Sequence, residues 1–301
     1  MTATTGTPTL DAIARPGGGF AMVAMDQRES LRAMFDQAGA GRPGNDVLIR
    51  FKLDVAEALG PLASGFLIDR HYGFDRVRSQ DLLPESDGLI LAADALQQED
   101  GGPVEETELD DTVVGGGVDL TGVSALKLLI IWRRDTRREH RVELADRFIR
   151  ASAELGLLSV LEPVVRATPA ELDAGTWDMD DAIVEAAREL SPLGPSLYKA
   201  QVPMAGAGDA EEQRRASERL GGAVQGPWVV LSQGVERDRF QDAVEAACRA
   251  GASGFLAGRA LWSDVVGHPD VPARLRELSR PRLESLIEVV DREARPWSDA
   301  R

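Results

Sequence analysis

The feature that most constrains the fold is a series of eight short apolar runs separated by amphipathic stretches. The runs are FAMVAM (20–25), SGFLID (64–69), GLILAAD (88–94), LKLLIIW (126–132), LLSVLEP (157–163), LYKAQV (197–202), WVVLSQG (228–234) and GFLAGR (254–259). Continuous apolar runs, as opposed to alternating ones, are typical of parallel strands that are buried on both faces. The sequence therefore predicts eight such strands.

The stretches between the runs have the apolar spacing of helices. Helices are expected at 45–59, 134–155, 178–190, 209–220 and 237–250. Eight strands alternating with helices favour an α/β fold closed into a (β/α)₈ TIM barrel over an open sheet. We expect one barrel domain over 10–297 and a flexible N-terminus at 1–9. The acidic, glycine-rich stretch 95–123 is expected to form a long excursion between the third and fourth strands.

Composition excludes several classes of function. The chain has 301 residues, with 34 basic and 50 acidic side chains and a net charge of −16, which argues against binding to nucleic acid or to anionic membranes. It has no apolar stretch of about 18 residues, and its first residues, MTATTGTPTL, are not expected to be a signal peptide. A single cysteine, Cys248, allows no internal disulfide and fits a cytoplasmic protein. The three histidines, His71, His140 and His268, show no ligand spacing, so neither a metal site nor a cofactor is expected.

A lysine in the middle of a buried strand is the most informative single residue. Lys199 lies inside the sixth run, and strand alternation places it on one face with Leu197 and Gln201. Lys127 lies inside the fourth run, and Glu162 ends the fifth. Active sites of TIM barrels lie at the carboxyl ends of the strands, so these three polar side chains are expected to meet inside the barrel.

Two lysines beside one carboxylate suggest amine chemistry. Desolvation and a neighbouring cation both favour the free amine of a lysine, which attacks a ketone and forms a Schiff base. The protonated imine then withdraws electrons, so the adjacent carbon–carbon bond can break. The alternative is an ion pair between Glu162 and one of the lysines with no catalytic role.

An anion site is expected after the seventh and eighth runs, the usual phosphate position in this barrel. Ser232, Gln233 and Gly234 directly precede an expected helix, and Gly258 and Arg259 begin another. Glycine lets backbone N–H groups approach an oxyanion, a helix N-terminus adds positive charge, and arginine adds a fork of donors. The alternative is that both glycines only make tight turns.

The stretch after the first run adds three candidates. Asp26 is a candidate to bind a substrate hydroxyl, and Arg28 to meet a second anion, with Gln27 between them. The alternative is a helix cap and a surface charge.

These residues lie in stretches that carry a family resemblance. The stretches are GGFAMVAMDQRESLRAMF, ALKLLIIWR, LLSVLEPVVR, SLYKAQVP, WVVLSQGV and GASGFLAGRALW, in this order over about residues 10–290. The chain resembles class I (Schiff-base) aldolases of the tagatose-bisphosphate aldolase type. Within that group it is most similar to the sulfofructose-phosphate aldolases of bacterial sulfoglycolysis, and DQRES and EPVVR carry that similarity.

The resemblance implies a role for each candidate. Lys199 would form the Schiff base, and Lys127 and Glu162 would be its partners in proton transfer. Asp26 would contact substrate hydroxyls.

The resemblance also implies an anion site, in which Ser232, Gly234 and Arg259 would hold the phosphate that ends up on dihydroxyacetone phosphate. Nothing in the sequence identifies the sulfonate ligands, for which Gln27 and Arg28 are the candidates.

The function expected on this basis is the reversible cleavage of 6-deoxy-6-sulfofructose 1-phosphate into dihydroxyacetone phosphate and 3-sulfolactaldehyde. Three alternatives stay open: a tagatose- or fructose-1,6-bisphosphate aldolase, a non-catalytic barrel that binds sugar phosphates, and a metal-dependent class II aldolase. Barrels of this kind often pair, so a homo-oligomer is expected.

Overall fold

The computed structural model describes residues 8–84, 88–99 and 102–300, and it is a closed barrel of eight parallel strands. The strands follow the order β1-β10-β9-β8-β7-β6-β3-β2 around the barrel. Their bounds are β1 Phe20–Met25, β2 Gly65–Ile68, β3 Gly88–Ala92, β6 Val123–Trp132, β7 Leu158–Val165, β8 Leu197–Ala200, β9 Trp228–Val230 and β10 Gly254–Ala257. The predicted single-domain TIM barrel is confirmed. The segment expected to be flexible lies outside the described residues, except for Pro8 and Thr9.

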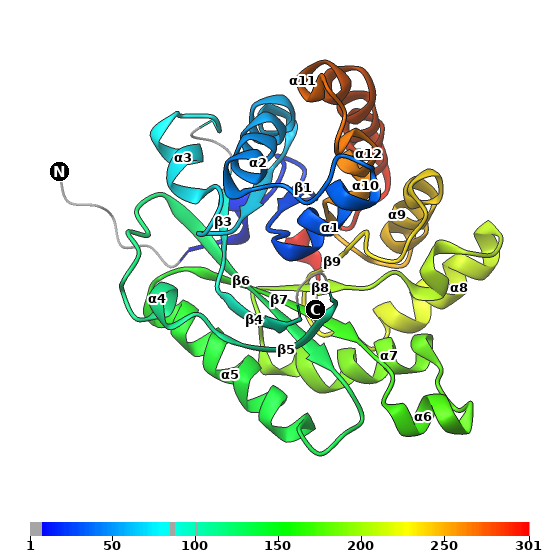
Figure 1. The fold of residues 1–301 in the computed structure, drawn as a ribbon. Coiled ribbons are helices and arrows are strands. Elements are labelled where there is room, and N and C mark those ends of the chain that lie inside the picture. Colours follow the sequence, from blue (N-terminus) through cyan, green and yellow to red (C-terminus); the bar gives the residue numbers. More distant parts are fainter. Residues whose placement is uncertain (1–7, 85–87, 100–101, 301) are drawn as a thin grey trace.

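Most of the helices surround the strands on the outside of the barrel (Figure 1). They are α1 Glu29–Gln37, α2 Asn45–Leu59, α3 Phe74–Ser79, α4 Asp111–Val114, α5 Arg138–Glu154, α6 Pro169–Ala174, α7 Met179–Leu190, α8 Ala210–Gly221, α9 Phe240–Arg249, α10 Arg259–Trp262, α11 Val271–Arg274 and α12 Arg280–Glu293. The five predicted helices correspond to α2, α5, α7, α8 and α9, and their bounds agree within four residues. No helix in the described part of the chain is long and apolar enough to cross a membrane.

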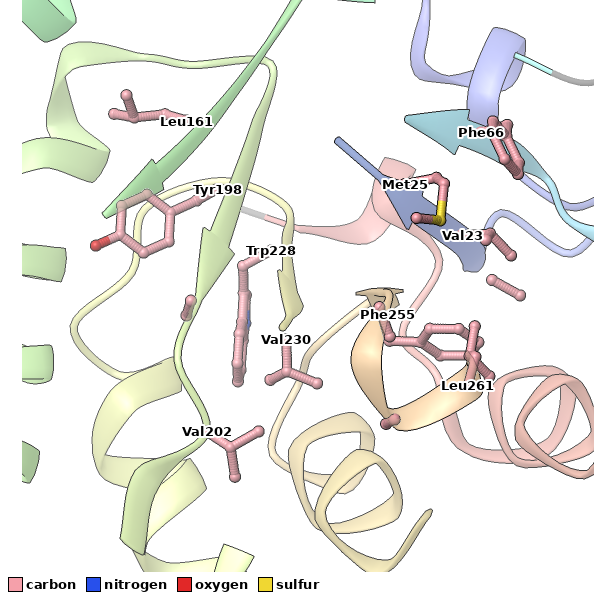
Figure 2. Packing of buried hydrophobic residues seen from close by; sticks show 14 of the residues in the cluster. Val23, Met25, Phe66, Leu161, Tyr198, Val202, Trp228, Val230, Phe255 and Leu261 are labelled. Carbon is pink, nitrogen blue, oxygen red and sulfur yellow. The ribbon is translucent and has the colours of Figure 1, made fainter. Parts of the chain in front are cut away.

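Strand alternation divides the core into two layers. Side chains such as Met22, Val160 and Leu197 fill the inside of the barrel. Side chains such as Tyr198 and Trp228 point outward and pack under the helices (Figure 2). Because Leu197 lies in the inner layer and Tyr198 in the outer one, Lys199 faces the barrel interior, as the alternation predicts.

The starts of the strands are covered by the two ends of the described chain. A 3₁₀ turn at Leu10–Ile13 places Leu10 and Ile13 in the inner core cluster, and Trp297 packs against the same cluster. The indole nitrogen of Trp297 donates to Asp11 at 3.3 Å. This end of the barrel is therefore filled with side chains, and the opposite end is left for a site.

The stretch 95–123 is an excursion between the third and fourth barrel strands, as expected, but it contains regular structure. The strands β4 (Asp94–Gln98) and β5 (Val104–Leu109) form an antiparallel hairpin beside β6 (Figure 1). The short helix α4 follows, and the Asp110 side chain caps it by accepting the N–H of Thr112. The strand β5 forms from the short alternating segment VEETEL, which was not predicted as a strand because the stretch is rich in glycine and acidic residues.

Basic side chains around the start of α5 hold the hairpin in place. Arg141 donates to Glu106 at 2.6 Å and to Asp135 at 2.6 Å. Arg133 bonds both the backbone and the carboxylate of Glu105. Glu105 and Glu106 of β5 therefore pair with arginines around the start of α5.

We predict that Gly254→Ala opens the closure between β1 and β10. A Cβ at Gly254 would lie 1.9 Å from the backbone oxygen of Phe20, at a φ of +135°. Clash and backbone strain together should lower the free energy of unfolding by about 3 kcal/mol, measured by urea denaturation.

Gly156→Ala is the matched control for this prediction. Gly156 also has a positive φ (+71°), but a Cβ there would meet nothing within 4 Å. The Gly156→Ala substitution should lower the free energy of unfolding by about 1–2 kcal/mol. An equal loss of stability in the two variants would contradict the packing argument.

Candidate active site

A cavity of about 320 Å³ opens at the carboxyl ends of the barrel strands. It is lined by nearly all of the residues singled out from the sequence: Asp26, Gln27, Arg28, Lys127, Glu162, Lys199, Ser232, Gln233, Gly258 and Arg259. Gly234 does not line it. The hairpin also contributes to the wall, through Leu96, Gln98 and Val104. The fold therefore brings together side chains that are up to 233 residues apart, from Asp26 to Arg259.

Two lysines share one carboxylate at the bottom of this cavity. The Nζ atom of Lys199 lies 2.9 Å from Oε1 of Glu162, and the Nζ atom of Lys127 lies 2.9 Å from Oε2. All three residues are at least 94% buried. Each oxygen of Glu162 therefore faces one ammonium or amine group, which fixes the orientation of the carboxylate between them.

Lys127 is the centre of the charged cluster. Besides Glu162, it donates to Asp26 at 2.8 Å and to Asp94 at 2.9 Å. Burial disfavours its charge, but the three carboxylates outweigh burial and raise the pKa of Lys127 well above its usual value. Burial likewise disfavours the charge of Asp26, but Lys127 and Lys199 outweigh it and lower the pKa of Asp26. Lys127 is therefore a permanent cation near neutral pH.

Arg28 completes the charged cluster by binding Asp94, the first residue of the hairpin. It donates to the backbone oxygen of Asp94 at 2.9 Å and to its carboxylate at 2.7 Å. It was expected to meet a second anion of the substrate, but its two terminal nitrogens are already engaged by Asp94. It does not cap α1 either, since no side-chain cap bond forms there.

A second buried ion pair supports the loop that carries Asp26 and Arg28. Lys52 projects from α2 and pairs with Asp69 at the end of β2, and both side chains are 0% exposed. Lys52 also donates to the backbone oxygens of Met25 and Gln27, at 2.7 Å each. The β1–α1 turn is therefore fixed from below by charge-assisted hydrogen bonds.

The expected anion site is only partly as predicted. Ser232 accepts the N–H groups of Gly258 and Ala260 at 3.3 and 3.4 Å, which leaves its own hydroxyl proton free to point into the cavity. Gly234 has a φ of +83°, so it makes a tight turn. The helix α9 does not follow directly, because a 3₁₀ turn at Arg237–Arg239 comes first.

Gly258 and Arg259 begin the one-turn helix α10, as expected. A Cβ on Gly258 would lie 2.5 Å from the backbone oxygen of Ala24, so this glycine is needed where β10 meets β1. Arg259 is half-buried, and burial lowers its pKa. It has no carboxylate within 4 Å among the described residues, which leaves it available to an anion.

Three residues that line or support the cavity were missed or left without a role by the sequence interpretation. Asp94 is the last residue of the third apolar run, and no role was assigned to it from the sequence. Lys52 interrupts the apolar stripe of α2, and it is one of only three lysines in the chain, all of them buried. Arg166 lines the cavity from the end of β7, and the alternation Glu162, Val164, Arg166 could have indicated it.

Comparison with known proteins identifies the family. Residues 20–264, most of the barrel, match the model of the DeoC/LacD family aldolases. The chain belongs to this family. It is an aldolase.

Similar proteins that bear the name of an aldolase come from bacteria. The chain is 27% identical to the tagatose 1,6-diphosphate aldolase of Listeria monocytogenes, over 96% of this chain and 92% of that protein. It is 26% identical to tagatose 1,6-diphosphate aldolase 2 of Streptococcus pyogenes, over 94% of each.

Solved structures agree in fold. The fructose-bisphosphate aldolase of Plasmodium falciparum superimposes with a TM-score of 0.67 at 16% identity, over 95% of this chain and 93% of that one. An archaeal fructose-1,6-bisphosphate aldolase, whose catalytic lysine is covalently bound to a carbinolamine intermediate, gives a TM-score of 0.54 at 17% identity, over 94% and 98%. Within the described residues of this protein, no group of three or more His, Cys, Asp or Glu side chains could hold a metal ion.

We predict that Asp26→Asn loses stability in a pH-dependent way. The Asp26 carboxylate, with its lowered pKa, contributes stability above its ordinary pKa of 3.8, and this is lost as pH falls through the lowered value. At neutral pH the variant should be about 1.5–3 kcal/mol less stable. The difference from wild type should shrink below a pH of about 4, measured by urea denaturation across the acid range. A difference that is constant or grows toward low pH would contradict the assignment.

Proposed function

We propose that this aldolase acts through a Schiff base on Lys199 and cleaves a ketose 1-phosphate that carries a second anion. The observation that supports the proposal most is the shared carboxylate: Glu162 contacts the Nζ atoms of Lys199 and Lys127 at 2.9 Å each, at the bottom of the cavity. A lysine in contact with a base, beside a fixed cation, is the arrangement that amine catalysis needs.

The reaction begins with the formation of the free amine of Lys199. Its ammonium form transfers a proton to Oε1 of Glu162, and the amine then attacks the C2 carbonyl of the ketose. Glu162 returns the proton to the carbinolamine oxygen, which leaves as water and gives the iminium. Lys127 keeps its charge throughout, because three carboxylates surround it.

Cleavage of the carbon–carbon bond follows from the iminium. The iminium nitrogen keeps its positive charge but has one N–H in place of three, so Oε1 of Glu162 can accept the proton of the C4 hydroxyl. The C3–C4 electron pair moves toward the iminium, which becomes an enamine, and the aldehyde leaves. Protonation at C3 and attack of water on the imine release dihydroxyacetone phosphate and restore Lys199.

The rest of the cavity orients the substrate. Arg259 and the hydroxyl of Ser232 hold the phosphate on C1, the carbon next to the imine. Asp26 faces the hydroxyl groups, since Lys127 holds its carboxylate at the cavity wall at 2.8 Å. Gly234 shapes the turn after β9 and contributes no side chain.

We propose 6-deoxy-6-sulfofructose 1-phosphate as the substrate, with 3-sulfolactaldehyde as the second product. Neutral amides, Gln27, Gln98 and Gln233, line the cavity. A sulfonate carries one charge and a phosphate monoester two, so neutral donors suit the sulfonate. The main alternative is tagatose 1,6-bisphosphate, the substrate in the names of the bacterial relatives. A cytoplasmic location and a homo-oligomer stay predictions.

Substrate preference is measured by comparing kcat/KM for the sulfofructose phosphate, tagatose 1,6-bisphosphate and fructose 1,6-bisphosphate. The proposal predicts the highest value for the sulfonated ketose, at least about tenfold above the others, a difference of about 1.4 kcal/mol in transition-state binding. A strong preference for a bisphosphate would contradict the substrate assignment but leave the mechanism intact.

The imine is tested by borohydride reduction in the presence of dihydroxyacetone phosphate, followed by peptide mass spectrometry. With only three lysines in the chain, the adduct can be assigned without ambiguity. We expect it on Lys199, its absence in Lys199→Arg and Lys199→Met, and a loss of turnover in both. No adduct in the wild type would favour a non-catalytic sugar-phosphate binder, and turnover abolished by EDTA would favour a class II mechanism.

A further inference from the structure

The charged groups of the cavity divide into a balanced cluster, an unbalanced pair, and Glu29, which is paired with Arg32 and Arg42 outside the cavity. Three cations (Arg28, Lys127 and Lys199) and three carboxylates (Asp26, Asp94 and Glu162) contact one another and sum to zero. Two further arginines line the same cavity, Arg166 and Arg259. Neither forms an ion pair or a side-chain hydrogen bond within the described part of the chain.

Arg166 follows the last residue of β7 and points into the cavity. It is half-buried, and its Nε atom is buried without a hydrogen-bond partner. Arg133, its basic neighbour, is engaged by Glu105 of the hairpin, and no carboxylate lies within 4 Å of Arg166 itself. Burial lowers the pKa of Arg166, and Arg259 shows the same effect. A cation taken from water with no partner is costly unless a ligand supplies the opposite charge.

The positions of the two arginines match the two ends of a ketose bound at Lys199. Around the barrel, the strands run β10-β9-β8-β7. Arg259 follows β10, Lys199 lies in β8 and Arg166 follows β7, so the two arginines stand on opposite sides of the imine-forming lysine. If the phosphate on C1 lies against Arg259, the carbons beyond C3 extend toward β7.

We propose that Arg166 binds the second oxyanion of the substrate, a terminal sulfonate or phosphate at the end of the sugar remote from the ketone. The inference rests on the proposed function and names a residue of the same site. It replaces Arg28 in that role, because Asp94 already holds both terminal nitrogens of Arg28.

The role also makes Arg166 a determinant of specificity. After cleavage the distal anion leaves with the aldehyde, so Arg166 contacts the half of the substrate that differs between sugars. It takes no part in the bond to Lys199. Its contribution should therefore depend on whether the substrate carries a distal anion.

The experiment compares wild type with Arg166→Gln on ketose 1-phosphates that differ only at C6. Fructose 1-phosphate has a hydroxyl there, fructose 1,6-bisphosphate a phosphate, and 6-deoxy-6-sulfofructose 1-phosphate a sulfonate. We expect kcat/KM to fall roughly 10- to 100-fold for the substrate with the preferred distal anion, the loss typical of one charge-assisted hydrogen bond. Fructose 1-phosphate should be turned over at an unchanged rate. The substrate with the larger loss tells whether sulfonate or phosphate is the ligand.

Two further variants separate binding from structure. Arg188→Gln removes an exposed arginine on the outer helix α7, and it should change none of these values. Arg166→Lys keeps the charge and should recover part of the lost kcat/KM. Trapping of dihydroxyacetone phosphate on Lys199 should be the same in Arg166→Gln as in wild type.

The inference and the function can fail separately. If wild type forms the Lys199 adduct but Arg166→Gln loses activity equally on all three ketoses, or on none, the role of Arg166 is wrong and the Schiff-base function stands. If wild type forms no adduct and cleaves none of the ketoses, both proposals are overturned.

Discussion

The structure of the site depends on one carboxylate that contacts two lysines. Burying one ammonium group without a partner is strongly unfavourable, and this barrel buries two within reach of the same glutamate. The structure resolves this by giving Lys127 three carboxylates, which hold it as a cation, and by leaving Lys199 with only Glu162. In the proposed mechanism the two lysines have different roles because they differ in the number of anions around them.

The same charge distribution determines where in the cavity positive charge is available for a ligand. The chain carries a net charge of −16, so an anionic substrate approaches a repulsive overall field. The balanced cluster at the bottom of the cavity offers no net attraction. Arg259 and Arg166 line the same cavity without a carboxylate partner and do offer net attraction, and they follow strands on the two sides of the strand that carries Lys199. In the proposed mechanism, attraction for the substrate and catalysis on it are thus performed by different groups.

The parts of this architecture that follow from local pattern could be predicted from the sequence. The eight apolar runs specify the barrel, and alternation around Lys199 specifies which way it faces. The contacts of Arg28 could not be predicted, because its partner Asp94 lies at the start of a hairpin whose course depends on ion pairs with the α5 region. The role of Lys52 could not be predicted either, because it lies among the apolar residues on the buried face of α2. Only tertiary packing brings it under the β1–α1 turn.

The most direct test of this account is a crystal structure of the protein soaked with a ketose phosphate. We predict continuous density from the Nζ atom of Lys199 to C2 of the sugar, Lys127 still bound to its three carboxylates, and an anion against Arg259. A sugar bound without a covalent bond, or joined to any group other than Lys199, would contradict the central claim.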